Sequence, residues 1–535
     1  MLAPIPAPRL LDHRSGTTAL GPVIHVAADE EAILAIRPLL RHLEDGLGSR
    51  IRRQPVDEPD IVVTRRHSGD ESYTVDVSPD GIAVEGDIAG LRHAAQTLRA
   101  LLPAASFRRG AAPTTANVPF VRIEDAPAYS WRGLMIDVSR HIMPFPWLLR
   151  LVEVMAFHKL NTLHLHLTDD QGWRMPVDAL PRLTEIGAHR RETLVGGRYS
   201  SQYDGTPYGG HYTKEQLREL VAFAGQHGIT VVPEIDMPGH MLAAIASYPQ
   251  WGNTGAQLEV LTRWAMSHNV MNIEESTLRD LTTVLDEVMD VFSSPWIHLG
   301  GDECPRAEWR DSARIAELMA ERGIADLDGV QTWIMRRLAD HVRAAGRTPL
   351  CWDEALSADL GSDVGIMAWR NEDTAIEALR GGHPTIVSNQ QYLYFDFKQS
   401  FDPDEPLGPE PDDFFMTPWE QVHAYRPLKG ADVPTPLGIQ AQLWTEFVES
   451  SEKAEYQLLP RLAAFAELAW TGGSADDDEA FRARLQDQLG RYEAMGLHYR
   501  PLDGPGARWS ATWHGPDADI APTIAVSEDE IDHAP

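Results

Sequence analysis

The sequence predicts an α/β protein whose main part is a (β/α)8 TIM barrel, preceded by a small N-terminal α/β domain. Its 535 residues are too many for one ordinary domain, so two or more units are expected. From about Arg132 onward, short apolar segments alternate with amphipathic helical segments, which is the pattern of β-α units. Acids, histidines and tryptophans follow almost every apolar segment, and barrel active sites lie at that end of the strands.

The first 125 residues have the pattern of a small sheet covered by helices. Pro79-Asp80-Gly81 is a turn sequence between two alternating segments, which predicts a hairpin. This part of the chain carries no motif for chemistry, so we expect its role to be structural. The expected elements are strands Val23–Ala27 and Ile61–Arg65, helices Glu30–Leu47 and Ile88–Leu102, and a hairpin over Ser72–Gly86.

Residues 126–505 are expected to form the barrel, and residues 506–535 an acidic, partly disordered tail. Thr213 and Gln216 have the spacing of a capping box at the start of one barrel helix, and Gly228 suits its end. Further helices are expected from Pro146, over Thr277–Phe292 and over Gln331–Ala345. The eight expected strands are Arg132–Asp137, Thr162–Leu167, Thr230–Ile235, Trp296–Gly300, Thr348–Trp352, Gly365–Trp369, Thr385–Ser388 and Gly438–Leu443.

The composition restricts the partners of the chain. Its 47 basic and 79 acidic residues give a formal charge of −32, which should repel nucleic acids and anionic membranes. No segment approaches the ~18 apolar residues of a membrane span, and the N-terminus lacks the pattern of a secretion signal. We therefore expect a cytoplasmic protein, whose oligomeric state the sequence leaves open. Cys304 and Cys351, its two cysteines, are expected to be buried free thiols.

The adjacent acids Asp302 and Glu303 follow an apolar strand and the pair Gly300-Gly301. The glycines allow a sharp turn and the close approach of a ligand. Two neighbouring carboxylates repel each other, so one of them holds its proton to higher pH. A proton donor beside a lasting negative charge suits the acid-catalysed cleavage of an acetal.

Histidines and acids also end the second and third strands. His164 and His166 point to the same face of their strand, so a metal site of the amidohydrolase type is one interpretation. The other is that a core histidine orients Asp169 or Asp302. Asp236 and His240 flank a Pro-Gly turn, which could bring an aspartate to a histidine and orient it.

Aromatic side chains at four further positions predict a cup at the mouth of the barrel, because sugars stack their C–H faces on such rings. Charged side chains nearby would bind hydroxyl groups with charge-assisted hydrogen bonds. Trp419 ends a long Pro- and Asp-rich connection, Ser400–Pro427, and is expected to fold over the site. The cup residues are Trp352, Trp369, Trp444 and Tyr394, and the hydroxyl-binding residues Arg132, Asp169, Asp396 and Glu446.

These residues carry a family resemblance. The strings WRGLMIDVSRH, HLHLTDDQGWR, VVPEIDMPGH, HLGGDE, YFDF and LWTE resemble the β-N-acetylhexosaminidases of glycoside hydrolase family 20. The resemblance covers roughly residues 20 to 500, including the N-terminal domain. It implies a retaining exo-glycosidase for terminal GlcNAc or GalNAc, in which the substrate's own 2-acetamido group attacks the anomeric carbon.

The resemblance also implies the roles of the residues. Glu303 would be the general acid and base, and Asp302 would hold the acetamido N–H and stabilise the positive charge of the oxazolinium intermediate. The three strand-end tryptophans would wall the acetamido pocket and Tyr394 would bind its carbonyl oxygen. Outside that pocket, Arg132 and Glu446 would bind the sugar hydroxyls, and Trp419 would support the next sugar. Asp169 and His240 would support the site, and Asp236 would orient His240. His166 and His298 are expected to lie behind the residues that touch the substrate.

The resemblance implies neither a cofactor nor a metal, and an oligosaccharide as the substrate. Two other classes stay open from the residues alone. One is a carbohydrate-binding protein on an inactive barrel, which would require the loss of Asp302 or Glu303. The other is the metal amidohydrolase. The choice between GlcNAc and GalNAc, the linkage, and the release of a disaccharide rather than a monosaccharide also stay open.

Overall fold

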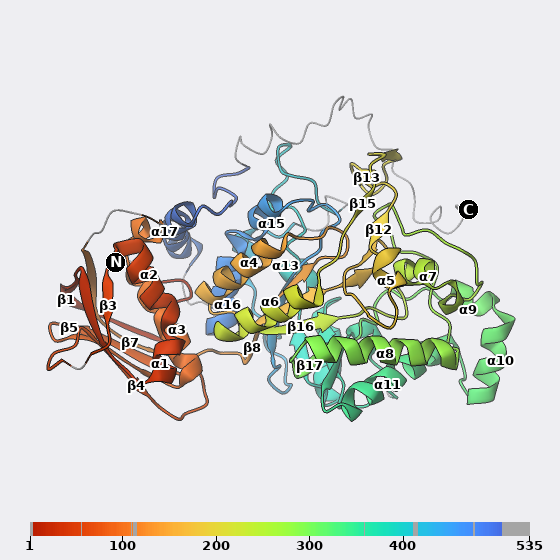
Figure 1. The fold of residues 1–535 in the computed structure, drawn as a ribbon, viewed down its shortest axis with the longest axis horizontal. Helices are drawn as coiled ribbons and strands as arrows, with labels where there is room; N and C mark the ends of the chain where they lie inside the picture. The colour runs from red at the N-terminus through yellow and green to blue at the C-terminus, as the bar shows by residue number, and fades with distance from the viewer. Residues whose placement is uncertain are drawn as a thin grey trace.

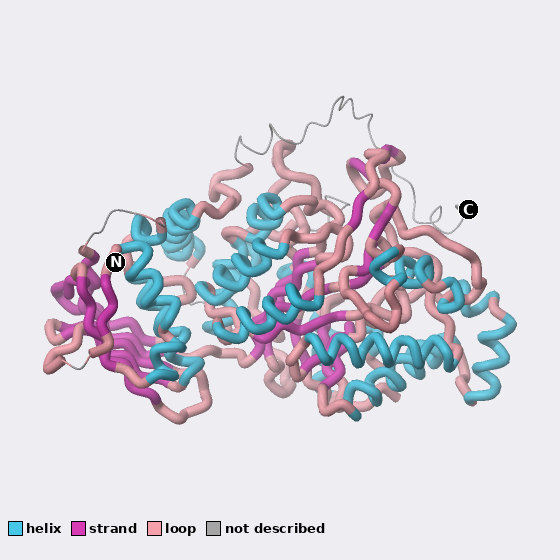
Figure 2. The backbone as a smooth tube through the Cα atoms, viewed as in Figure 1, coloured by secondary structure: helices cyan, strands magenta, loops and turns pink. Residues whose placement is uncertain are grey.

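A closed barrel of eight parallel strands and a separate seven-stranded sheet make up the computed structural model of the protein (Figure 1). The structure describes residues 4–54, 56–108, 110, 115–357, 359–409, 416–473 and 477–505. The predicted acidic tail, 506–535, lies outside these residues. The strands of the barrel occupy the centre of the molecule and those of the sheet lie at one end (Figure 2). The predicted fold class is confirmed.

Each of the eight predicted barrel strands is present, with ends within two residues of the prediction. Every neighbouring pair is parallel, and the last strand pairs with the first from Gly438 opposite Trp131 to Leu443 opposite Ile136, which closes the barrel. The strands, in barrel order, are β8 (Trp131–Asp137), β9 (Thr162–His166), β16 (Thr230–Glu234), β17 (Trp296–His298), β18 (Thr348–Trp352), β19 (Gly365–Ala368), β20 (Thr385–Val387) and β21 (Gly438–Leu443).

Amphipathic helices surround the barrel, with their apolar sides packed on the strands. The predicted capping box is present: Thr213 accepts a hydrogen bond from the backbone of Gln216, whose side chain accepts one from the backbone of Thr213. The longer helices are α4 (Phe145–Phe157), α6 (Lys214–Gln226), α8 (Glu275–Val291), α10 (Ala313–Arg322), α11 (Leu327–Ala344), α12 (Glu372–Arg380), α15 (Ser451–Leu458), α16 (Arg461–Thr471) and α17 (Asp478–Met495).

Short elements fill the connections above the carboxyl ends of the strands. After β9 the chain forms three two-stranded ribbons that pair β10 with β11, β12 with β15 and β13 with β14. These elements are β10 (Thr168–Asp169), β11 (Gly172–Trp173), β12 (His189–Arg190), β13 (Leu194–Val195), β14 (Gln202–Tyr203), β15 (Tyr208–Gly209), and helices α5 (Arg182–Glu185), α7 (Leu242–Ser247), α9 (Ala307–Asp311), α13 (Gln390–Leu393) and α14 (Trp419–Ala424).

The N-terminal sheet has the strand order β1-β7-β5-β6-β4-β2-β3, and its helices lie on the side that faces the barrel (Figure 1). The prediction of a single helix over Glu30–Leu47 is wrong in one respect. The segment forms two helices that meet at Ile36, and Pro38 lies in the first turn of the second. The elements are β1 (Leu10–Leu20), β2 (Val23–Ala27), α1 (Glu30–Ala35), α2 (Arg37–Leu47), β3 (Arg50–Arg52), β4 (Ile61–Arg65), β5 (Tyr73–Ser78), β6 (Gly81–Gly86), α3 (Ile88–Leu101) and β7 (Ala116–Asp125).

Each part of the chain has its own hydrophobic core, and buried polar contacts join the two. Asp125, at the end of β7, accepts hydrogen bonds from Trp470 Nε1 at 2.9 Å and from Lys159 Nζ at 3.0 Å. Trp470 belongs to α16 of the barrel but packs into the core of the N-terminal sheet. We propose that the N-terminal domain ends at residue 125 and that the barrel domain begins at residue 126.

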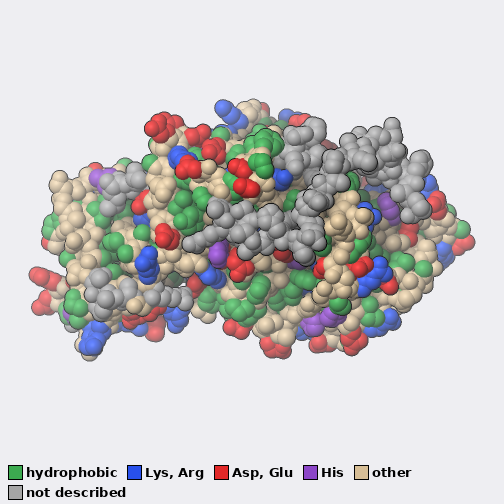
Figure 3. Space-filling model, turned by 90° about the horizontal axis from the view of Figure 1, so that it is seen from above, with side chains coloured by type: hydrophobic (Ala, Val, Ile, Leu, Met, Phe, Trp, Pro, Cys, Tyr) green, Lys and Arg blue, Asp and Glu red, His purple; other side chains and the backbone are tan. Residues whose placement is uncertain are grey.

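On the face shown in Figure 3, acidic and basic side chains are interspersed. Among the described residues, none of the helices combines the length and the apolar composition needed to cross a bilayer. Cys304 and Cys351 are free thiols, as predicted, although Cys304 is only partly buried. Burial raises the pKa of both thiols, so neither is a ready nucleophile.

Candidate active site

The acid pair Asp302-Glu303 lies directly beyond the carboxyl end of β17. Gly300 has φ +71° and Gly301 φ +102°, conformations that favour glycine. A Cβ at Gly300 would lie 1.7 Å from Asp236 Oδ1, so no larger residue fits there. Glu303 itself has φ +41°, an uncommon conformation that is found more often at functional sites. The sharp turn predicted from the two glycines is confirmed.

A buried histidine connects Glu303 to a buried aspartate. His240 Nδ1 donates to Asp169 Oδ1 at 3.1 Å, while its Nε2 lies 3.5 Å from Glu303 Oε2 and 3.8 Å from Asp302 Oδ2. Asp169 and His240 are buried, whereas the side chain of Glu303 is 49% exposed. Of these three side chains, Glu303 is therefore the one that is open to solvent. The orienting partner of His240 is Asp169, so the prediction that Asp236 orients it is wrong.

The charges around His240 separate the pKa values of the two adjacent acids. Burial, and then the nearby carboxylate of Asp236, raise the pKa of Asp302 well above its usual range. The hydrogen bond from His240 lowers the pKa of Glu303. Burial opposes the charge on His240, but Asp169 keeps its pKa well above the usual value. The predicted difference between the two acids is present, and it favours the proton on Asp302 over Glu303.

Asp236 supports the turn that carries the acid pair. Its Oδ1 accepts a hydrogen bond from the backbone N–H of Gly301 at 3.2 Å, and its Oδ2 has no partner among the described residues. Burial is the main cause that raises the pKa of Asp236 to about 7. Its hydrogen bond is therefore with the loop of Asp302, although one of its carboxylate oxygens lies within 4.8 Å of a ring nitrogen of His240.

Arg132, predicted to bind sugar hydroxyls, lies at the opposite end of the barrel from the acid pair. It stands near the start of β8, fully buried, and donates to the backbone oxygens of Lys159 and Tyr129 and to Glu71 Oε2 at 2.7 Å. Glu71 belongs to the N-terminal domain, so Arg132 joins the two domains. The substrate-binding role predicted for Arg132 is wrong.

Arg140, three residues beyond the end of β8, is the arginine at the site. Its guanidinium lies 2.8 Å from Asp169 Oδ2, 4.0 Å from Glu446 Oε1 and 5.1 Å from the ring of Trp444. Arg140 is not among the predicted site residues, although it stands in the same sequence string as Arg132. The rule that site residues follow the strands selects Arg140, because Arg132 is the second residue of its strand.

The four predicted cup residues come together at the mouth of the barrel. The ring of Trp369 stacks on Tyr394, with centroids 6.0 Å apart and planes 19° apart. Trp444 lies 6.0 Å from Trp352 and 6.3 Å from Tyr394. Trp352 and Tyr394 are buried, while Trp369 and Trp444 keep exposed area. The four rings therefore form one aromatic cluster.

Asp396 and Glu446 form a second pair of acids at the rim. Asp396 is buried and its Oδ1 has no hydrogen-bond partner among the described residues, like Oδ1 of Asp302. Burial, followed by the charge of Glu446, raises the pKa of Asp396 well above its usual range. Buried polar atoms without a partner are rare in proteins, so these two carboxyl oxygens are candidates for hydrogen bonds to a ligand.

Trp419 does not lie over the site. It begins α14, is 3% exposed, and packs on Phe481 of α17 with ring centroids 5.7 Å apart. Its side chain belongs to the hydrophobic core outside the barrel. The prediction that Trp419 supports a second sugar is wrong, because an apolar core offers such a ring more buried area than the rim of a wet site does.

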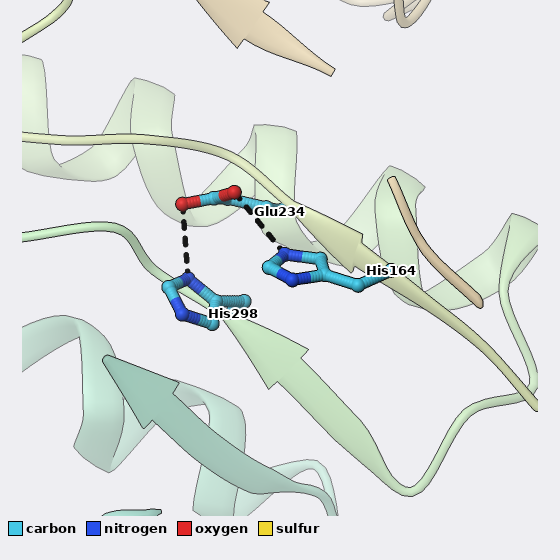
Figure 4. Close-up of side chains that lie close together, drawn as sticks. All are labelled: His164, Glu234 and His298. Carbon is cyan, nitrogen blue, oxygen red and sulfur yellow. Dashed lines mark ion pairs between the residues drawn. The ribbon is translucent and has the colours of Figure 1, made fainter. Parts of the chain in front are cut away.

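Beneath the site, the carboxylate of Glu234 lies between the rings of His164 and His298 (Figure 4). His166 Nδ1 and Trp352 Nε1 donate to its two oxygens, each at 2.7 Å. Burial alone would raise the pKa of Glu234, but the histidines hold it well below its usual range. Glu234 is not among the predicted site residues. Its position at the end of β16, among inward-facing residues, is the signal that could have identified it.

Hydrogen bonds connect this buried cluster with the acid pair. His166 Nε2 lies 2.8 Å from Asp169 Oδ2, so the prediction that a core histidine orients Asp169 is confirmed. The ligand atoms of His164, Glu234 and His298 lie within 4.8 Å of one another, a spacing that a metal ion could use. Since Glu234 already accepts from His166 and Trp352, the contacts present are those of a hydrogen-bonded support for the site.

Two models of one protein family match both parts of the chain. Residues 129–473 match the family model described as glycosyl hydrolase family 20, catalytic domain, and residues 3–126 match the one described as domain 2 of the same family. The residues alone left two other protein classes possible, an inactive sugar-binding barrel and a metal amidohydrolase. The family match excludes the amidohydrolase.

Two curated relatives show how far the similarity extends. A beta-hexosaminidase of Porphyromonas gingivalis is 35% identical over 447 residues, covering 82% of this chain and 56% of that protein. The chain thus spans little more than half the length of that relative. A beta-N-acetylhexosaminidase of Cellulomonas fimi is 31% identical over 512 residues, covering 92% of this chain and 91% of that protein.

Solved structures share both the barrel and the preceding domain. The exo beta-N-acetylglucosaminidase of Vibrio harveyi, solved with N-acetylglucosamine, has a TM-score of 0.82 at 30% identity and covers 94% of this chain and 79% of its own. The beta-N-acetylhexosaminidase of Streptomyces coelicolor has a TM-score of 0.80 at 30% identity and covers 93% and 97%. The predicted family is confirmed: the chain belongs to glycosyl hydrolase family 20.

Proposed function

We propose that the protein is a retaining exo-β-N-acetylhexosaminidase, which removes terminal GlcNAc or GalNAc from oligosaccharides by substrate-assisted catalysis. One observation carries the proposal: Glu303 stands half-exposed at the mouth of the barrel, linked through His240 to Asp169 and adjacent to the buried Asp302. The relatives named above act on N-acetylhexosamines, and the apolar cup beside Asp302 suits an acetamido methyl group.

In the first step the 2-acetamido oxygen of the sugar attacks its own anomeric carbon and forms an oxazolinium intermediate, while Glu303 gives its proton to the leaving oxygen. The attack is intramolecular, so it exploits proximity and needs no enzyme nucleophile. In the second step Glu303 removes a proton from water, which attacks the anomeric carbon and reopens the ring. The configuration is retained because two inversions occur.

This scheme needs one proton on the acid pair, and that proton must move from Asp302 to Glu303 when the sugar binds. Before a sugar binds, burial favours the proton on Asp302 over the half-exposed Glu303. A bound sugar covers Glu303 and brings a partly positive acetamido N–H to Asp302. Both changes transfer the proton toward Glu303, where the leaving group needs it.

The other side chains would bind the sugar. Trp352, Trp369 and Trp444 would enclose the acetamido group, and the Tyr394 hydroxyl would donate to its carbonyl oxygen. Arg140 takes the place that the sequence analysis gave to Arg132. Together with Asp396 and Glu446, it would bind hydroxyl groups through charge-assisted hydrogen bonds.

The experiment that tests this function is a panel of p-nitrophenyl glycosides. We expect hydrolysis of the β-N-acetylglucosaminide and the β-N-acetylgalactosaminide, and none of the β-glucoside, which lacks the acetamido nucleophile. N-acetylglucosamine-thiazoline should inhibit competitively. Rapid cleavage of the β-glucoside would contradict substrate assistance, and release of a disaccharide from the lacto-N-bioside would contradict removal of single sugars. A protein that binds the inhibitor without turnover would be the inactive sugar-binding barrel.

A further inference from the structure

Glu354 lies beside the site but has no part in the reaction described above. It belongs to the short turn Asp353–Ala355, which directly follows β18. Its Oε2 accepts a hydrogen bond from Trp369 Nε1 at 2.9 Å. The ring of Trp369 stacks in turn on Tyr394. Among the described residues, Glu354 is thus the hydrogen-bond partner of a ring that would wall the acetamido pocket.

Charged groups from several strand ends face Glu354. Asp302 approaches from the end of β17, Asp353 from the same turn, and Tyr394 from the segment after β20. Asp353 is buried, and its Oδ1 accepts from Arg370 Nε at 2.9 Å. The guanidinium of Arg370 therefore makes a charge-assisted hydrogen bond to Asp353.

Two neighbouring carboxyl groups attract each other only when one of them carries a proton. Oδ2 of Asp353 is buried and has no hydrogen-bond partner among the described residues, so it can accept a hydrogen bond. Burial, followed by the charges of Asp302 and Asp353, raises the pKa of Glu354 to about 9. At neutral pH the proton therefore sits on Glu354, whose second oxygen can donate toward Asp353 while Oε2 accepts from Trp369.

We propose that Glu354 is a positioning residue that acts as a neutral carboxylic acid, holding the ring of Trp369 in place against the acetamido pocket. Arg370, Asp353, Glu354 and Trp369 then form one chain of hydrogen bonds from the surface to the pocket wall. Loss of the proton puts two like charges side by side at Asp353 and Glu354 and releases the ring. The inference rests on the proposed function only for the identity of the group that the ring encloses.

The first test compares Glu354→Gln with Glu354→Ala in the full chain. Glutamine keeps an acceptor for Trp369 and a donor for Asp353, whereas alanine removes both. On p-nitrophenyl N-acetylglucosaminide at pH 7, we expect Glu354→Ala to raise KM about tenfold, the effect of one lost hydrogen bond, with a smaller change in kcat. Glu354→Gln should restore KM to within about threefold of the wild type. Equal KM values for both variants would overturn the proposal.

The second test needs no substrate. Tryptophan fluorescence of the ligand-free full chain is titrated from pH 7 to pH 10, with circular dichroism to confirm folding. We expect a transition near pH 9 in the wild type that is absent from both Glu354→Gln and Trp369→Phe, since other tryptophans and tyrosines contribute equally to all three. A transition that persists in Glu354→Gln would overturn the proposal. If no N-acetylhexosaminide were hydrolysed, the proposed function would fail while this titration still decided the role of Glu354.

Discussion

His240 donates a hydrogen bond through Nδ1 to Asp169 at 3.1 Å, and this contact leaves its other nitrogen facing Glu303. Asp169 is held in turn by Arg140 and His166, at 2.8 Å each. The one exposed acid of the site is therefore connected to a buried network in which both ring nitrogens of His166 have carboxylate partners. A rigid support of this kind fixes the geometry of a proton donor.

Replacement of Glu303 by glutamine should abolish most turnover without unfolding the protein. General acid catalysis contributes roughly 10²–10⁴-fold, so kcat on an unactivated chitooligosaccharide should fall by about that factor. A substrate with a good leaving group, such as a dinitrophenyl glycoside, should lose less in its first step. The thermal midpoint is the control, because Glu303 is half-exposed. Near wild-type turnover on chitobiose would reject the assignment.

Replacement of Asp302 by asparagine should impair the acetamido-assisted attack itself. The loss of a charge that stabilises the transition state typically costs about 10²–10³-fold in kcat. In contrast to Glu303→Gln, a better leaving group should not rescue this variant. Steady-state rates on p-nitrophenyl and dinitrophenyl glycosides distinguish the two patterns. An unchanged rate on the p-nitrophenyl N-acetylglucosaminide would remove the role given to Asp302.

Arg140 and Arg132 provide a matched pair of variants. Lysine keeps the charge at each position but cannot reproduce the planar contacts of a guanidinium. Arg140→Lys should lower kcat/KM by about tenfold or more, since Asp169 and the rim lose a fixed donor. Arg132→Lys should lower the thermal midpoint, because it weakens the contact with Glu71, and leave kcat/KM within about twofold. The reverse result would restore the sugar-binding role to Arg132.

Buried neutral histidines should make the fold sensitive to acid. Burial lowers the pKa of His158 from 6.5 to about 3, so the folded state takes up its proton less readily than the unfolded state. The stability that His158 contributes is complete above pH 6.5 and is lost as the pH falls toward 3. At pH 4 the loss is on the order of 3 kcal/mol, from 1.36 kcal/mol for each pH unit.

His158→Gln tests this linkage. Glutamine does not titrate and can still bond the hydroxyl of Tyr492, which lies 2.7 Å from His158 Nε2 in the wild type. We expect the free energy of unfolding to fall less steeply between pH 6.5 and pH 4 in this variant, as measured by urea titration at each pH. A parallel pH dependence in both proteins would show that His158 does not contribute.

Local sequence patterns were enough to predict the barrel strands and the tryptophans at their ends. β18 and β21 have the predicted ends, because a short apolar run between turn residues is recognisable without its neighbours. Trp352, Trp369 and Trp444 could be assigned to one face, since each lies at or just after the end of a strand. Glu234 and Arg140 also lie at or after strand ends, but this position alone does not show which charged groups a side chain meets.

Motifs and hydrophobic periodicity act over a few residues at a time, so they were enough to predict the family, the barrel, the domain before it and the acid pair beyond the fourth barrel strand. Which side chains meet follows only from the folded chain: Asp169 and not Asp236 bonds His240, Arg132 binds Glu71, Trp419 enters the outer core, and the pKa of Asp302 rises while that of Glu303 falls. Pairing and burial depend on distances between segments far apart in the chain, and electrostatic energies follow those distances.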